Sequence, residues 1–92
     1  MRLRFSRHAR DHLVDIRAHI AGHRPVTAGL VRGRILESIR SLKDAPRLGR
    51  AGRKQGTREL VVPGLPYIIV YSIAAKEDAL VILGIFHAAR ER

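Results

Sequence analysis

Residues 56–72 constrain the fold more than any other stretch of this chain. They read GTRELVVPGLPYIIVYS and hold two apolar segments, 60–62 and 67–73, separated by Pro63 and Gly64. Proline presets φ at the first central position of a turn and glycine accepts a positive φ at the second, so the pair predicts a type II turn. Successive side chains of a strand point to opposite faces. Because both faces of 67–73 are mostly apolar, we expect a β-hairpin whose second strand lies in the middle of a small sheet.

Two amphipathic helices are predicted before the hairpin. Ser6 is a suitable N-cap for the first, Gly22 ends it, and Pro25 suits the first turn of the second. Apolar residues recur every three or four positions in both, which is the spacing of one helix face. They are Ala9, Leu13, Ile16 and Ile20 in the first helix, and Ala28, Val31, Ile35, Ile39 and Leu42 in the second.

Gly29 and Gly33 lie one turn apart inside the second helix, where each costs about 1 kcal/mol relative to alanine. Such a pair permits close approach of a neighbouring backbone. We interpret that neighbour as the first helix, with a partner chain as the alternative.

The remaining segments complete an α+β pattern. Residues 2–5 alternate basic and apolar side chains, which is typical of an edge strand, and residues 80–87 form a last strand with apolar faces. The order β-α-α-β-β-β predicts a helical hairpin packed on one face of a small, largely antiparallel four-stranded sheet. We expect one domain over residues 1–92. The other face of the sheet then needs cover from a partner, a second copy or the C-terminal tail.

The charge of the chain is strongly basic. Its 18 Lys and Arg against 8 Asp and Glu give a formal charge of +10, which favours nucleic acid, an acidic protein surface or an anionic membrane as partner. Residues 47–58 form a glycine-containing loop without an acid, and its mutually repelling cations favour contact with a partner over a solvated connector. The five cations are Arg47, Arg50, Arg53, Lys54 and Arg58.

Other compositional features narrow the possibilities. Without cysteine, disulfides and thiolate metal sites are excluded and a cytoplasmic location is expected. The longest apolar run, residues 79–86, is too short to span a bilayer. The histidines of the first helix region share a face and could bind a metal, but without an acidic or cysteine ligand in register a solvated helix face is favoured. They are His8, His12, His19 and His23. No metal or cofactor is expected.

Four blocks in chain order resemble the RelE/ParE superfamily of bacterial toxins, the toxic halves of type II toxin–antitoxin pairs. They are residues 46–50 (PRLGR), 56–62 (GTRELVV), 67–71 (YIIVY), and 81–83 (VIL) leading into His87 and Arg90. The resemblance covers nearly the whole chain, and the family's fold agrees with the order of elements read from the residues. It implies a cognate acidic antitoxin, a toxin–antitoxin hetero-oligomer, and one of two targets.

The two branches of the superfamily differ in target. RelE-like members cut messenger RNA on the ribosome, whereas ParE-like members inhibit DNA gyrase. RNA cleavage needs a base, an acid and cations. The resemblance implies Glu59, His87 and Arg90 as an incomplete set, because Ala88 follows His87 where several ribonuclease members carry tyrosine. This departure favours the gyrase-inhibiting branch, and an inhibitor protein over an enzyme.

Three functions follow for testing. The first is a ParE-like gyrase inhibitor, with a target-binding surface made of the five loop cations together with His87 and Arg90. The second is a ribosome-dependent endoribonuclease, and the third a small basic nucleic-acid-binding domain. An antitoxin is expected to contact the first helix through Leu13, Ile16, Arg17 and Ile20.

Overall fold

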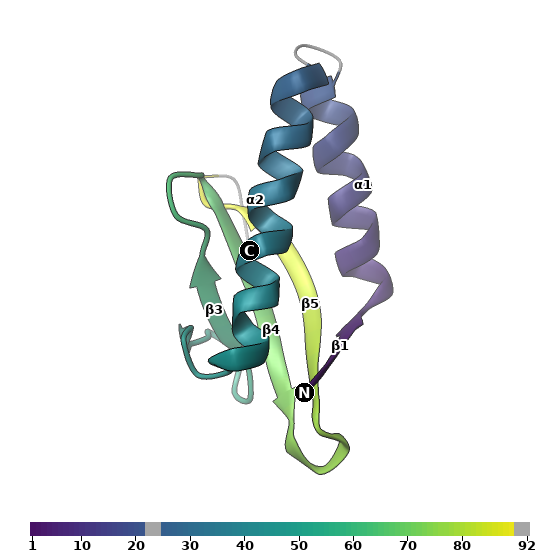
Figure 1. Cartoon of the computed structure of the whole chain (residues 1–92). Coiled ribbons are helices and arrows are strands. Elements are labelled where there is room, and N and C mark those ends of the chain that lie inside the picture. Colours follow the sequence, from purple (N-terminus) through teal and green to yellow (C-terminus); the bar gives the residue numbers. More distant parts are fainter. Residues whose placement is uncertain (22–24, 90–92) are drawn as a thin grey trace.

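The structure, a computed structural model, describes residues 1–21 and 25–89 (Figure 1). Gly22, His23 and Arg90, which the sequence singled out, lie outside the described residues. The elements in chain order are β1 (Arg2–Phe5), α1 (Arg7–Ala21), α2 (Pro25–Asp44), β2 (Arg50–Ala51), β3 (Arg58–Val61), β4 (Tyr67–Ala74), the short 3₁₀ turn η1 (Ala75–Glu77) and β5 (Ala79–His87).

In the described part of the chain, five strands form one sheet in the order β1-β5-β4-β3-β2. The first and last strands, β1 and β5, pair in parallel, and the other neighbours are antiparallel. The predicted helical hairpin on a small, largely antiparallel sheet is therefore confirmed, with β4 in the middle. The prediction of four strands was one too few, because Arg50 and Ala51 pair with Glu59 and Arg58 to form β2.

The turn between β3 and β4 has the predicted geometry. The Leu65 amide donates to the Val62 carbonyl over 3.1 Å, with Pro63 and Gly64 between them. Gly64 has a φ of 75°, as the second central position of a type II turn requires. Pro63 and Gly64 thus form the turn that connects β3 to β4, as the sequence predicts.

Ser6 joins the start of α1 to β5. Its Oγ accepts a hydrogen bond from the Ala9 amide (3.1 Å), which confirms the predicted N-cap, and donates to the Leu83 carbonyl (3.0 Å). Leu83 is the additional residue at a β-bulge, since Val70 pairs with Gly84 whereas Tyr71 pairs with Ile82.

Figure 1 shows how the helices and the sheet are arranged. The core packs between the helices and the face of the sheet that carries Ile69 and Tyr71. The predicted stripe of α2, from Ala28 to Leu42, is buried at all five positions. In α1, Ala9 is buried while Leu13 and Ile16 are half-buried and pack against the core. The side chains of His19 and Ile20 lie outside the described residues.

Gly29 and Gly33 correct one interpretation. A Cβ built at either position meets nothing within 4 Å, and both residues are exposed. The pair therefore does not admit α1, because α2 turns its apolar stripe to the sheet and the glycines to solvent. No helix of the described chain is both long and apolar enough to cross a membrane.

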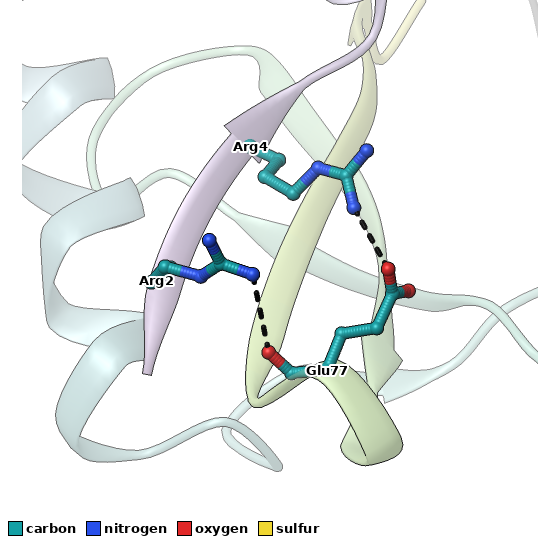
Figure 2. Close-up of polar contacts among 3 residues, drawn as sticks. All are labelled: Arg2, Arg4 and Glu77. Atoms are coloured by element: carbon teal, nitrogen blue, oxygen red, sulfur yellow. Dashed lines mark hydrogen bonds and ion pairs between the residues drawn. The ribbon is translucent and has the colours of Figure 1, made fainter.

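The arginines of β1 are exposed, as expected of an edge strand, and reach the turn before β5 (Figure 2). Arg4 Nη1 lies 3.2 Å from Glu77 Oε1, and Arg2 Nη2 donates to the Glu77 carbonyl over 3.5 Å. Exposed pairs of this kind contribute about 0–1 kcal/mol each. They orient the edge strand more than they stabilise it.

Candidate functional site

Two side chains of the sheet hold the first part of the basic loop, residues 47–58, through hydrogen bonds. Tyr71, fully buried on β4, donates through its hydroxyl to the Pro46 carbonyl (2.7 Å) and accepts from the Gly49 amide (2.9 Å). Arg58 donates from Nε to the Gly49 carbonyl (3.0 Å) and from Nη2 to the Arg47 carbonyl (3.1 Å). Four hydrogen bonds thus fix the first part of the loop.

Gly49 is needed at this point for space. A Cβ there would lie 2.7 Å from the Glu59 carbonyl oxygen and 2.8 Å from the Tyr71 hydroxyl. The backbone of the loop can therefore approach the sheet this closely only without a side chain.

Glu59 holds the second part of the loop. Its side chain is buried on β3, its Oε2 accepts from the Arg53 amide (3.2 Å), and its Oε1 lies 3.8 Å from Arg50 Nη2. A buried carboxylate is tolerated when hydrogen bonds and a nearby cation compensate its lost hydration. Thr57 adds a bond from its Oγ1 to the Lys54 carbonyl (2.6 Å). Both parts of the loop are therefore held in place by hydrogen bonds to the sheet or within the loop.

The five loop cations divide into two groups. The side chains of Arg47, Arg50, Arg53 and Lys54 are exposed, and Arg50 leans toward Glu59. Arg58 is half-buried with its guanidinium bound to loop carbonyls. Sequence reasoning put all five in one class, but the structure makes Arg58 an anchor of the loop and leaves the other four at the surface.

A pocket of about 500 Å³ opens beside the loop, on the face of the sheet opposite Tyr71; we call it the sheet-face pocket. Its apolar floor comes from the sheet, its cations from the loop, and its imidazoles from α1. The lining residues are His8, His12, Arg53, Lys54, Thr57, Glu59, Val70, Leu83 and Phe86.

His12 closes one side of this pocket. Its Nδ1 accepts a hydrogen bond from the Ile85 amide (3.0 Å), beyond the stretch of β5 that β1 covers. Its ring meets Phe86 edge-to-face with centroids 4.9 Å apart, and the His8 ring lies 6.3 Å away. Helix α1 therefore covers part of the second face of the sheet. Among the described residues no group of three or more His, Cys, Asp or Glu could hold a metal.

Of the residues implied for RNA cleavage, Glu59 and His87 are not brought together, and Arg90 lies outside the described residues. His87 pairs with Tyr67, whereas Glu59 pairs with Val70. Tyr67 and Val70 are three residues apart on one strand, so their side chains, and those of their partners, lie on opposite faces of the sheet. His87 instead meets the Tyr67 ring edge-to-face at 5.5 Å and accepts the Ala89 amide at Nδ1.

A second hollow of about 680 Å³ lies between β1, α1 and α2; we call it the helix–strand groove. Apolar side chains form its floor and four arginines surround them. The lining residues are Leu3, Arg4, Phe5, Arg10, Leu13, Val14, Arg17, Arg32 and Leu36. Of the residues predicted to bind an antitoxin, Leu13 and Arg17 lie in this groove, while Ile16 packs against the core.

Comparison with known proteins identifies the family. Residues 3–92 match the family model described as the ParE toxin of the type II toxin–antitoxin system parDE. The chain belongs to the ParE toxin family. It is 37% identical over 82 residues to a Sinorhizobium fredii protein named "Putative toxin Y4kP", covering 89% of this chain and 85% of that protein. The chain is thus a toxin of the RelE/ParE superfamily, as the resemblance implied.

Solved structures share the fold. A chain described as a chromosomal ParDE TA system from P. aeruginosa has a TM-score of 0.84 and 23% identity, with 95% of each chain covered. The toxin–antitoxin complex RelBE of E. coli gives a TM-score of 0.74 and 13% identity, covering 97% of this chain and 98% of that chain. A ParE family member therefore has the same fold as proteins from both branches.

Sequence reasoning missed most of the sheet-face pocket. Arg53, Lys54 and Glu59 had been singled out, but Val70 and Phe86 were read only as apolar strand positions. His8 and His12 were noted for their spacing without a place in the fold. The signal that was available is the pair of imidazoles four residues apart on a helix that must also pack against the last strand.

Proposed function

We propose that this ParE family toxin acts by inhibiting DNA gyrase, and that its basic loop contacts the target. The main support for the proposal is that hydrogen bonds fix the backbone of the loop while its cations stay exposed. Four exposed cations stand on a backbone that Tyr71, Arg58 and Glu59 fix in place. A rigid cationic surface loses little entropy on binding and attracts an acidic protein surface or a protein–DNA complex.

The separation of Glu59 from His87 supports an inhibitor over a ribonuclease. A base and an acid on opposite faces of a sheet cannot act on one phosphodiester. Ala88, in place of an aromatic residue, points the same way. We therefore expect no cleavage of messenger RNA on translating ribosomes.

The helix–strand groove supports an acidic antitoxin segment as the neutralising partner. Its apolar floor suits one face of an amphipathic segment, and the surrounding arginines suit acidic residues on the rim. We propose that the antitoxin contacts Leu13 and Arg17 there, beside Ile16 and Ile20, in a toxin–antitoxin hetero-oligomer within the cytoplasm.

The decisive experiment combines a supercoiling assay of purified gyrase with primer extension on translating ribosomes. The variant Arg47→Glu, Arg53→Glu, Lys54→Glu reverses three exposed loop cations and spares Arg50, whose reversal would place a carboxylate beside Glu59. Wild type is expected to inhibit supercoiling, and the variant to lose roughly 3 kcal/mol of interaction, about a hundredfold in potency, at ~1 kcal/mol per site.

The matched control, Arg40→Glu, Lys43→Glu, Lys76→Glu, changes the formal charge of +10 by the same amount at exposed sites away from the loop and the groove. It is expected to inhibit within about threefold of wild type, since distant exposed charges are screened at physiological salt. New ribosomal cuts with undisturbed supercoiling would replace this proposal with the ribonuclease alternative.

A further inference from the structure

The sheet-face pocket combines apolar, acidic and basic side chains, whereas the exposed side chains of the bordering loop are mainly basic. The floor of the pocket consists of Val70, Leu83 and Phe86, all half-buried. Partly exposed apolar side chains in a concave surface favour burial against another apolar group. The floor therefore accepts an aliphatic or aromatic side chain.

The wall of the pocket selects against phosphate. Glu59 is buried there, with one carboxylate oxygen bound by the Arg53 amide and the other facing Arg50. A phosphate group brought to the floor would lie near this carboxylate, in a setting where like charges repel more strongly than in bulk water. Glu59 therefore disfavours a phosphate group on the floor, whereas it does not disfavour an uncharged apolar side chain there.

The rim has the opposite sign. Arg53 and Lys54 are exposed at the mouth, beyond the floor, and the exposed His8 completes the rim from α1. An acidic residue next to an inserted apolar side chain would meet these groups at the surface. The pocket thus combines an apolar floor with a cationic rim, a pattern that fits a peptide better than a nucleic acid.

We infer that the sheet-face pocket docks a segment of the toxin's protein target in which one large apolar side chain is flanked by acidic residues. The apolar side chain fills the space above Val70 and Phe86, and its acidic neighbours pair with Arg53 and Lys54. The inference rests on the proposed function, since it gives the chemistry by which the basic loop recognises its target. It separates that target from the antitoxin, which the helix–strand groove receives.

The test uses a variant that fills the pocket. Val70→Phe adds a phenyl ring above the floor, whereas Ser72→Phe adds the same ring two residues along β4, on the same face but outside the pocket. Both variants are first compared with wild type by thermal melting. The folded proteins are then used to select from a display library of random dodecapeptides, and the selected peptides are synthesised.

We expect peptides with a large apolar residue between Asp or Glu residues. Val70→Phe is expected to weaken their binding by at least about tenfold, and Ser72→Phe by less than about twofold. An octamer of deoxythymidine serves as the nucleic-acid probe and is expected not to compete. Competition by this octamer, selected peptides of another pattern, or equal binding by Val70→Phe would overturn the proposal.

The gyrase assay separates this inference from the function on which it rests. If wild type and Val70→Phe inhibit supercoiling equally, the docking role of the pocket is wrong while the proposed function stands. If wild type leaves gyrase active, the proposed function fails, and the peptide selection alone decides the occupant. Loss of inhibition in Val70→Phe with retention in Ser72→Phe supports both.

Discussion

The helix–strand groove and the sheet-face pocket lie on different sides of α1, and they carry their charge differently. The groove is lined by four arginines and no acid, whereas the pocket has two cations at its mouth and the buried Glu59 in its wall. A net charge of +10 attracts acidic partners to both. The comparison teaches that two sites on one basic chain need not suit the same ligand: under the proposals above, the groove takes an amphipathic acidic segment and the pocket takes an apolar side chain between acids.

The largest expected effect comes from removing the cations of the groove. Arg10→Glu, Arg17→Glu, Arg32→Glu reverses three exposed charges and leaves the apolar floor intact. At ~1 kcal/mol per site, affinity for the proposed cognate antitoxin should fall by about a hundredfold or more. Calorimetric titration measures this loss.

Toxicity should persist in this variant, so cells that also make the antitoxin should stop growing. The control Arg40→Glu, Lys43→Glu, Lys76→Glu should still be neutralised. If the antitoxin fully protected cells that carry the groove variant, it would have to bind elsewhere. The helix–strand groove would then have no assigned ligand to compare with that of the pocket.

An intermediate effect is expected from loosening the basic loop that borders the pocket. Tyr71→Phe keeps the buried ring but removes the hydroxyl that bonds Pro46 and Gly49. Leaving the Gly49 amide without this acceptor should cost about 1–3 kcal/mol of unfolding free energy, measured by urea denaturation. Peptide binding at the pocket should weaken while antitoxin binding at the groove does not change. Equal losses at both sites would show that the variant disturbs the whole fold.

The smallest effect concerns single exposed cations. Lys54→Ala should weaken the inhibition of supercoiling by only about 0–1 kcal/mol, which is a change in potency of at most about fivefold. Raising salt from 0.1 M toward 1 M shortens the screening length from about 10 Å to about 3 Å and should weaken groove binding more than pocket binding. Equal slopes at the two sites would show that both partners make the same number of ion pairs, contrary to the difference between four arginines in the groove and two cations at the pocket.

Local patterns accounted for most of the fold. The type II turn, the Ser6 cap and the buried stripe of α2 each depend on residues within one or two turns of chain, and each was predicted. The two-residue strand β2 was not, because it depends on the pairing of Arg50 with the buried Glu59. Gly29 and Gly33 were assigned the wrong neighbour, since spacing along a helix does not say which helix lies nearby.

The candidate site was harder to predict from the sequence, because it also depends on contacts between residues far apart in the chain. The pocket brings together the first helix, the loop and the last strand, and His12 is held at its side by a hydrogen bond from Ile85, 73 residues away. No local period specifies such a contact. The loop cations could be read directly, but the distinction between the anchoring Arg58 and the exposed Arg53 requires knowledge of where the carbonyls of Gly49 and Arg47 point.

The parallel pairing of β1 with β5 has a consequence for the folding of this chain. β1 precedes both helices and β5 follows the other strands, so the contacts between them are among the most distant along the chain. A nascent chain ending at residue 78 would have neither β5 nor the Ile85 amide that His12 binds. We expect such a chain to show weaker hydrogen-exchange protection of β4, which would then be paired with β3 alone.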